Sequence, residues 1–294
     1  MLRRSFWALG GGPAGPSAVG RRNARAVAVL RQPDAVRLGD TNLLNNAPSE
    51  YLETAKAARA QGYDCVKVCP VYVAPNGQRA RNRGVVPPEF RKLARARMEA
   101  VREGSGAGAD IILEMNSLTS TAGALQIAEL VADLDILFME EPTHYNGPEA
   151  HVKVSSRSPI PLATGKRLYT RWGFLPYLQA GSIDMIQPDV GLVGGISEGV
   201  KIAHHAHTFD VGVQAHVCGS PLATAIAPQV EAAIPNFEIH EHHSFNLKSG
   251  NRALFGEDPQ PVDGRLAVPT APGCGMTLRR DVEKRMGITA VGSA

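Results

Sequence analysis

The chain has little of what marks several classes of protein. Its 294 residues include only four cysteines and no C-x-x-C pair, so a secreted disulfide scaffold is not expected. No apolar run approaches the ~18 residues that a membrane-spanning helix needs. The 31 basic residues are offset by 28 acidic ones, and the net charge of +3 is too small to indicate a nucleic acid or a membrane surface as partner. We therefore expect a cytoplasmic protein with neither kind of partner.

The chain does contain enough apolar residues, 44%, for a sizeable core. After about residue 50, short apolar strands alternate with segments that have the three-to-four apolar spacing of amphipathic helices. Such strands indicate parallel pairing with both faces covered. Eight units of this kind predict a (β/α)8 TIM-type barrel, and a doubly wound open sheet is the alternative. The expected strands are 24–30, 64–70, 110–116, 135–142, 160–166, 183–189, 210–217 and 235–241.

Most of the expected strands end in a polar or charged side chain. In a barrel of parallel strands these ends meet at one mouth, where the active site lies. One charged strand end is usually a cap or an ion pair, but so many together indicate an active site. The residues concerned are Lys67, Glu114, Asn116, Glu140, Glu141, Lys166, Asp189, His216 and Glu241.

Three of these residues are evenly spaced, because Glu140 lies 26 residues after Glu114 and Lys166 lies 26 residues after Glu140. One βα unit separates each from the next, so we expect the three at equal height on adjacent strands. Three carboxylates there would form a site for Mg²⁺, which prefers oxygen ligands. The chain supplies two carboxylates and an ammonium. Glu141 is expected to face away from Glu140, because side chains alternate along a strand.

Several segments, in order and spacing, resemble the mandelate racemase branch of the enolase superfamily. The resemblance is closest to acid-sugar dehydratases of the galactonate dehydratase type. In such enzymes Mg²⁺ holds the substrate carboxylate, a base removes the proton α to it, and the enediolate expels the 3-hydroxyl. The segments are ILEMN, FMEEP, ATGKRLYTRWGF, IQPDVGLVGGISEGVKIA, VQAHVCGSPLATA and IPNFEIHEHH.

The resemblance implies a role for each residue at the mouth. Glu114 and Glu140 correspond to two metal ligands, and Lys166 stands where a third, a glutamate, is expected. Asp189 and His216 resemble an Asp–His dyad, in which the histidine is the base because its ordinary pKa lies near neutrality. The expected catalytic residues are His216, Asp189, Glu241 and Lys67, and the expected substrate-binding residues are Asn116, Lys166 and His144.

Two residues depart from the family pattern. Lys166 is expected to form an internal ion pair with Glu114 and Glu140, which would leave Mg²⁺ binding weak or absent. Asn116 stands where galactonate-type dehydratases have a histidine, and an amide cannot act as an acid. We therefore expect an acid-sugar dehydratase, a carbon–oxygen lyase with impaired activity. The alternatives are an inactive homologue that has lost its metal site and, ranked last, a Schiff-base enzyme using Lys166.

The resemblance also sets the expected domain organisation. Residues 1–23 would be the remnant of a truncated N-terminal capping domain, residues 24–255 the barrel, and residues 256–294 a turn-rich segment that packs back on it. The expected partner is a small acid-sugar substrate, and a homo-oligomer is left open.

Overall fold

The computed structural model describes residues 23–29, 47–80, 84–145, 147–243 and 249–284. The segment expected to be a capping-domain remnant lies outside the described residues, apart from Asn23, which begins the first strand. Residues 285–294 of the expected C-terminal segment lie outside them as well.

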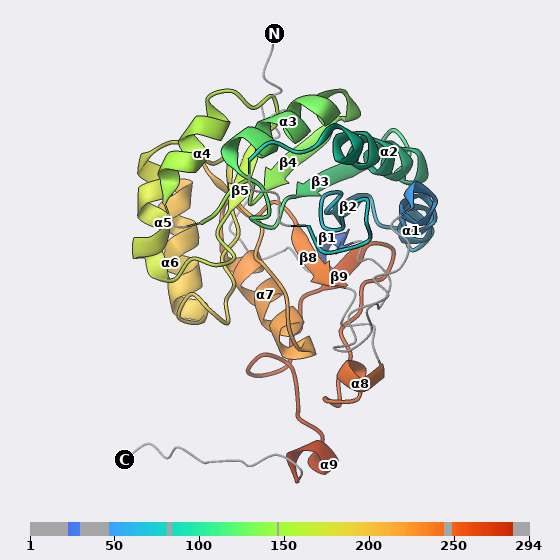
Figure 1. Ribbon diagram of the computed structural model, residues 1–294. Coiled ribbons are helices and arrows are strands. Elements are labelled where there is room, and N and C mark those ends of the chain that lie inside the picture. Colours follow the sequence, from blue (N-terminus) through green and yellow to red (C-terminus); the bar gives the residue numbers. More distant parts are fainter. Residues whose placement is uncertain (1–22, 30–46, 81–83, 146, 244–248, 285–294) are drawn as a thin grey trace, which may run out of the picture.

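Eight parallel strands form one continuous sheet, in the order β7-β6-β5-β4-β3-β2-β1-β8 (Figure 1). Phe237, just before β8, makes a parallel bridge to Val213 of β7, so the two ends of the sheet meet. This arrangement confirms the predicted barrel and rules out the doubly wound sheet. The strands are β1 (Asn23–Val29), β2 (Cys65–Val68), β3 (Asp110–Glu114), β4 (Ile136–Glu140), β5 (Leu162–Thr164), β6 (Met185–Ile186), β7 (Gly212–Val213) and β8 (His240–His243).

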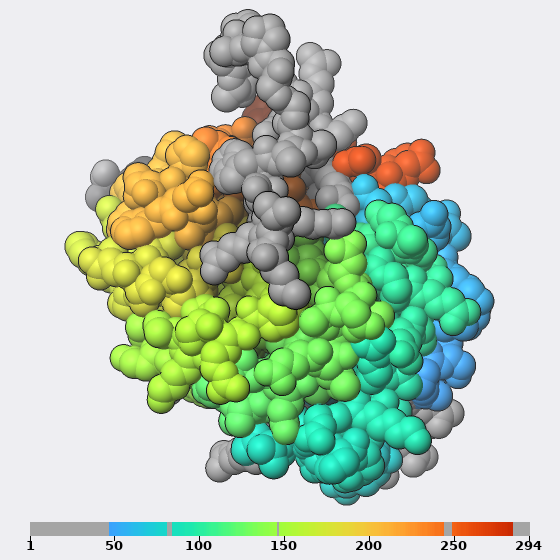
Figure 2. Space-filling view, turned by 90° about the horizontal axis from the view of Figure 1, so that it is seen from above, coloured from blue at the N-terminus to red at the C-terminus, as the bar shows by residue number. Residues whose placement is uncertain are grey.

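Helices follow the strands and surround the barrel (Figure 1). Seen from above, the elements run around the molecule in chain order, from blue near α1 to orange at α7 (Figure 2). In the part of the chain that the structure describes, no helix has both the length and the apolarity to cross a membrane. The helices are α1 (Pro48–Ala60), α2 (Pro88–Ser105), α3 (Thr121–Val131), the 3₁₀ turn η1 (Ala132–Leu134), α4 (Pro148–Ser155), α5 (Thr170–Gln179), α6 (Ile196–His207), α7 (Pro221–Ala233), α8 (Ser249–Arg252) and α9 (Arg280–Glu283).

Local sequence explains where several of these helices begin. Proline occupies the first turn of α1, α2, α4 and α7, where its missing N–H is not needed. Before α3, the Ser120 hydroxyl accepts the backbone N–H of Gly123 at 3.2 Å and so caps the helix. The short strand β9 (Arg265–Ala267), from the segment after residue 255, pairs antiparallel with β1.

Two layers of side chains follow from the strand period of two. One buried apolar layer contains one residue from, or next to, most of the barrel strands: Cys65, Ile112, Phe138, Ala163, Met185 and Ile239. Two positions after each of these residues in the sequence lie Lys67, Glu114, Glu140, Gly165, Gln187 and Glu241. Because alternate residues share a face of a strand, five polar side chains are stacked on an apolar floor, toward the carboxyl ends of the strands.

The last two predicted strands differ from those in the structure, because one is shifted and the other is shorter. The segment 235–241 was expected to be a strand that ends at Glu241, whereas β8 is His240–His243 and pairs Glu241 with Val27 of β1. The expected strand 210–217 shortens to Gly212–Val213, so His216 lies in the loop that follows. Both glutamate and histidine still lie on the mouth side of the apolar layer.

Candidate active site

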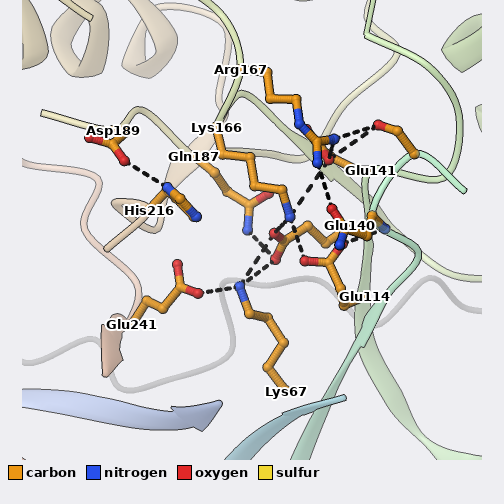
Figure 3. Close-up of polar contacts among 12 residues, drawn as sticks. Lys67, Glu114, Glu140, Glu141, Lys166, Arg167, Gln187, Asp189, His216 and Glu241 are labelled. Atoms are coloured by element: carbon orange, nitrogen blue, oxygen red, sulfur yellow. Dashed lines mark hydrogen bonds and ion pairs between the residues drawn. The ribbon is translucent and has the colours of Figure 1, made fainter. Parts of the chain in front are cut away.

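The ammonium of Lys166 lies between two glutamates of the polar layer. Its Nζ donates to Glu114 Oε2 at 2.5 Å and to Glu140 Oε1 at 2.7 Å (Figure 3). Glu140 is fully buried, and the lysine and Glu114 are nearly so. The predicted ion pair between this lysine and the two glutamates is therefore confirmed.

The backbone brings the three residues together differently from the prediction. Glu114 and Glu140 are direct register partners on β3 and β4, as their spacing indicated. On β5, however, the partner of Glu140 is Ala163, so Lys166 lies three residues beyond that height, after the strand has ended. The backbone leaves the direction of β5 at Gly165, which has φ +139°. A Cβ there would lie 2.6 Å from Phe174 Cε1. The expectation of equal height is wrong for Lys166, whose long side chain spans the difference.

A second lysine lies deeper in the same layer. Lys67, 3% exposed, donates to Glu140 Oε2 at 3.0 Å and forms an ion pair with Glu241. Gln187 Nε2 also donates to Glu140 Oε2, at 2.6 Å, and to Gln214 Oε1 at 2.7 Å. Sequence analysis missed both glutamines, although each is a polar residue inside an apolar strand segment.

The charges in this cluster shift one another's pKa values. Burial raises the pKa of Glu114 to about 8, and the neighbouring Glu140 carboxylate adds to the shift. Burial would raise the pKa of Glu140 too, but Lys166 and Lys67 outweigh it and hold that pKa well below its ordinary value. Burial alone would lower the pKa of both lysines, but the surrounding carboxylates raise it. Both lysines therefore stay protonated at neutral pH, and Glu114 holds a proton more readily than Glu140 or Glu241, whose pKa values are lowered.

Asp189 and His216 form a separate pair beside this cluster. His216 Nδ1 lies 2.8 Å from Asp189 Oδ2 (Figure 3). Each side chain is partly exposed, 16% for His216 and 13% for Asp189. The next backbone N–H, that of Val217, donates to Glu241 Oε2 at 3.1 Å and thereby ties the histidine loop to the lysine–glutamate cluster.

Arg167 organises the outer rim of the site, and sequence analysis missed it. Its guanidinium forms an ion pair with Glu141 and donates to Asn116 Oδ1 at 2.6 Å and to Ser117 Oγ at 2.9 Å. Glu141 has φ +45°, so the strand alternation ends at Glu140, and Oε2 of Glu141 lies 3.6 Å from Lys166 Nζ. The expectation that Glu141 faces away is therefore wrong.

The remaining predicted residues take less central positions. The backbone N–H of Asn116 donates to Glu114 Oε1 at 2.5 Å, while its side-chain oxygen is held by Arg167. His144 is exposed and stacks on Tyr145, with ring centroids 4.5 Å apart, outside the ion-pair cluster. The catalytic, metal-binding and substrate-binding roles assigned to these residues from the sequence stay predictions.

Comparison with known proteins identifies the family to which this chain belongs. Residues 50–282 match the family described as enolase C-terminal domain-like. The chain belongs to the enolase superfamily. The resemblance noted from the sequence motifs is thus confirmed.

Individual relatives agree with this assignment. The chain is 30% identical over 235 residues to a D-xylonate dehydratase of Haloferax volcanii, covering 80% of this chain and 57% of the relative. It is also 30% identical over 235 residues to a D-gluconate dehydratase of Thermoproteus tenax, of which 46% is covered. The crystal structure of a member of the enolase superfamily from Salmonella Typhimurium matches with a TM-score of 0.84 and 36% identity, over 90% of this chain and 68% of that one. The chain thus spans about half the length of the curated relatives it matches.

Enolase-superfamily enzymes generally use Mg²⁺, but the residues here do not fit it. Mg²⁺ requires near-octahedral oxygen ligands at about 2.0–2.1 Å. The neighbouring carboxylates of Glu114 and Glu140 instead share the ammonium of Lys166. Among the residues that the structure describes, no group of three or more His, Cys, Asp or Glu side chains is arranged to hold a metal ion.

Proposed function

We propose that the chain is an acid-sugar dehydratase of low activity, which removes the proton α to the carboxylate of a polyhydroxy acid and eliminates the 3-hydroxyl. The observation that carries the proposal is the partly exposed Asp189–His216 pair at the barrel mouth, beside a cluster of buried lysines and glutamates. The relatives named D-xylonate, D-gluconate and D-galactonate dehydratase support the substrate class.

His216 is the proposed base. Its Nδ1 faces the Asp189 carboxylate at 2.8 Å, so Nδ1 carries the hydrogen and Nε2 keeps a lone pair for the substrate. Asp189 fixes this tautomer and stabilises the imidazolium that forms when the proton arrives. Asp189 is itself held by the backbone N–H of Gly191 at 2.8 Å, so the dyad is positioned before a substrate binds.

The lysines would stabilise the negative charge that develops as the proton leaves. Lys166 and Lys67 are buried and protonated, and positive groups in a water-poor site stabilise a developing anion more than they would in water. Because Glu114 has a raised pKa, it carries less negative charge at neutral pH than an ordinary carboxyl. That reduces the repulsion that a substrate carboxylate would meet there.

Two features explain why low activity is proposed. Both lysines already donate to glutamates of the chain, so much of their charge is neutralised before a substrate arrives. Asn116 cannot protonate the departing 3-hydroxyl. In the proposed reaction the proton that His216 removes from C2 is returned to the 3-hydroxyl oxygen, which leaves as water. The resulting enol then loses its C2 hydroxyl proton and gains a proton at C3, and the product is a 2-keto-3-deoxy acid.

Proton exchange in D₂O tests the first step apart from the elimination. The purified chain would be incubated with D-xylonate, D-gluconate and D-galactonate in the presence of EDTA, with C2–H exchange followed by NMR and keto product by a colorimetric assay. We expect slow exchange with at least one acid, abolished in His216→Asn and reduced about a hundredfold or more in Asp189→Asn.

Two results would count against the proposal. Equal exchange by the chain and by His216→Asn would remove the histidine from the reaction. Binding of an acid with no exchange would favour the alternative of an inactive homologue. Lys153→Glu, which alters an exposed residue of α4, is the control for a change in net charge and should leave exchange unchanged.

A further inference from the structure

We infer that Lys166 is the resident cation of this site, so that the chain binds no divalent metal between Glu114 and Glu140, and that Lys166→Glu creates a divalent-cation site there. Cation binding at this place is independent of whether the chain turns over a sugar acid. It is therefore measured directly, and the proposed dehydration can fail without affecting the result.

The first support is that each oxygen of the two carboxylates already accepts from a donor of the chain. Glu140 Oε1 accepts from Lys166, and Oε2 accepts from Lys67 at 3.0 Å and Gln187 at 2.6 Å. Glu114 Oε2 accepts from Lys166, and Oε1 accepts the backbone N–H of Asn116. A metal ion would have to break several of these charge-assisted bonds, which are among the stronger hydrogen bonds in proteins.

The second support is the cost of moving the ammonium aside. Lys166 is 7% exposed, and its two shortest contacts are with Glu114 and Glu140. Displacement by a metal ion would leave a buried positive charge beside a second, divalent one. An uncompensated buried charge is strongly destabilising, so we expect the lysine to hold its place against millimolar Mg²⁺.

The third support is the formal charge of the cluster. Lys67, Lys166 and Arg167 face four carboxylates, so the cluster sums to −1 when all groups are ionised; the carboxylates are Glu114, Glu140, Glu141 and Glu241. In Lys166→Glu, two cations face five carboxylates and the sum is −3. A bound divalent cation returns it to −1. Three carboxylates, at positions 114, 140 and 166, then supply the hard oxygen ligands that Mg²⁺ and Mn²⁺ prefer.

The experiment compares the unaltered chain, Lys166→Glu and the control Lys153→Glu after treatment with a chelator. Mn²⁺ binding is followed by the loss of its free EPR signal, and Mg²⁺ binding by the shift in the thermal unfolding midpoint. We expect the unaltered chain and Lys153→Glu to bind Mn²⁺ with the same affinity. We expect Lys166→Glu to bind one Mn²⁺ at least about tenfold more tightly and to be stabilised by Mg²⁺.

Stoichiometric Mn²⁺ binding by the unaltered chain that Glu140→Gln abolishes would overturn the inference. So would a folded Lys166→Glu variant that binds Mn²⁺ no better than the control. If Lys166→Glu does not fold without metal, refolding it with and without Mn²⁺ decides the matter. Recovery only with the ion supports the inference, and failure in both conditions contradicts it.

Discussion

Glu114→Gln should change how the stability of the protein depends on pH. Glu114 lies at the end of β3, nearly buried, beside the carboxylate of Glu140. Burial and that neighbour raise its pKa from an ordinary value of 4.5 to about 8. Between these values the folded chain holds a proton on Glu114 and the unfolded chain does not. The free energy of unfolding must therefore fall as the pH rises through this window.

The size of the effect follows from the two pKa values. Each unit of difference corresponds to about 1.36 kcal/mol, so the rise from 4.5 to about 8 amounts to roughly 5 kcal/mol in total. About 3.5 kcal/mol of this is lost between roughly pH 5 and roughly pH 8, because titration is only partial near each pKa. Below the unfolded pKa the carboxyl is protonated in both states, and above the folded pKa it is ionised in both, so outside the window the contribution is constant. Glutamine does not titrate, and in Glu114→Gln this contribution disappears.

Urea unfolding at a series of pH values measures the effect. Distant titrating groups are common to both proteins and cancel in the difference between the two stability curves. The pKa values of the neighbouring Glu140 and Lys166 lie well below and well above this window. We expect the variant to gain about 3.5 kcal/mol relative to the unaltered chain from pH 5 to pH 8. Glu129→Gln, which removes an exposed carboxyl from α3, controls for the lost negative charge. Curves that run parallel for Glu114→Gln and the unaltered chain would refute the assignment of a raised pKa to Glu114.

Two further variants test how the framework holds the site. Arg97→Met should cost about 3 kcal/mol in urea unfolding, because a buried guanidinium that donates to the carbonyls of Pro70 and Val73, each at 2.7 Å, is lost; a loss below about 1 kcal/mol would show that these bonds are replaced. Gly165→Ala should cost at least about 2 kcal/mol, because the residue has φ +139° and the new Cβ would lie 2.6 Å from Phe174 Cε1; an unchanged unfolding midpoint would contradict the need for glycine.

The sequence was informative about the barrel because its strands carry strong local patterns. Segments such as 110–116 and 135–142 are apolar runs bounded by a helix on each side, and the structure places β3 and β4 inside them. The 26-residue spacing predicted that Glu114 and Glu140 would be neighbours, and they are register partners. Strand ends were predicted less well, since β6 and β7 keep only two paired residues each.

Contacts that depend on backbone conformation after a strand could not be predicted. Glu141 turns toward Arg167 because its φ is +45°, and Asn116 and Ser117 also have positive φ. None of the three is glycine, so no residue type marked the change of direction. Lys166 reaches the glutamates only through the exit at Gly165, which the sequence spacing does not reveal.

Partners within the buried polar layer were also missed, although a signal existed. The apolar layer contains Ile112, Phe138, Met185 and Ile239, and the residue two positions after each is polar and points to the same side. This rule places Gln187 and Glu241 in the same layer as Glu140. It does not say that Lys67 lies between Glu140 and Glu241, because pairing across the barrel depends on the three-dimensional closure.

The central claim is that an ammonium of the chain takes the place of a divalent cation between two glutamates. A crystal grown without metal and then soaked in Mn²⁺ tests it most directly, because manganese gives an anomalous signal at its own position. The account predicts continuous density for the Lys166 side chain between Glu114 and Glu140, with no anomalous peak there. A manganese peak within bonding distance of both carboxylates, with Lys166 turned away, would contradict it.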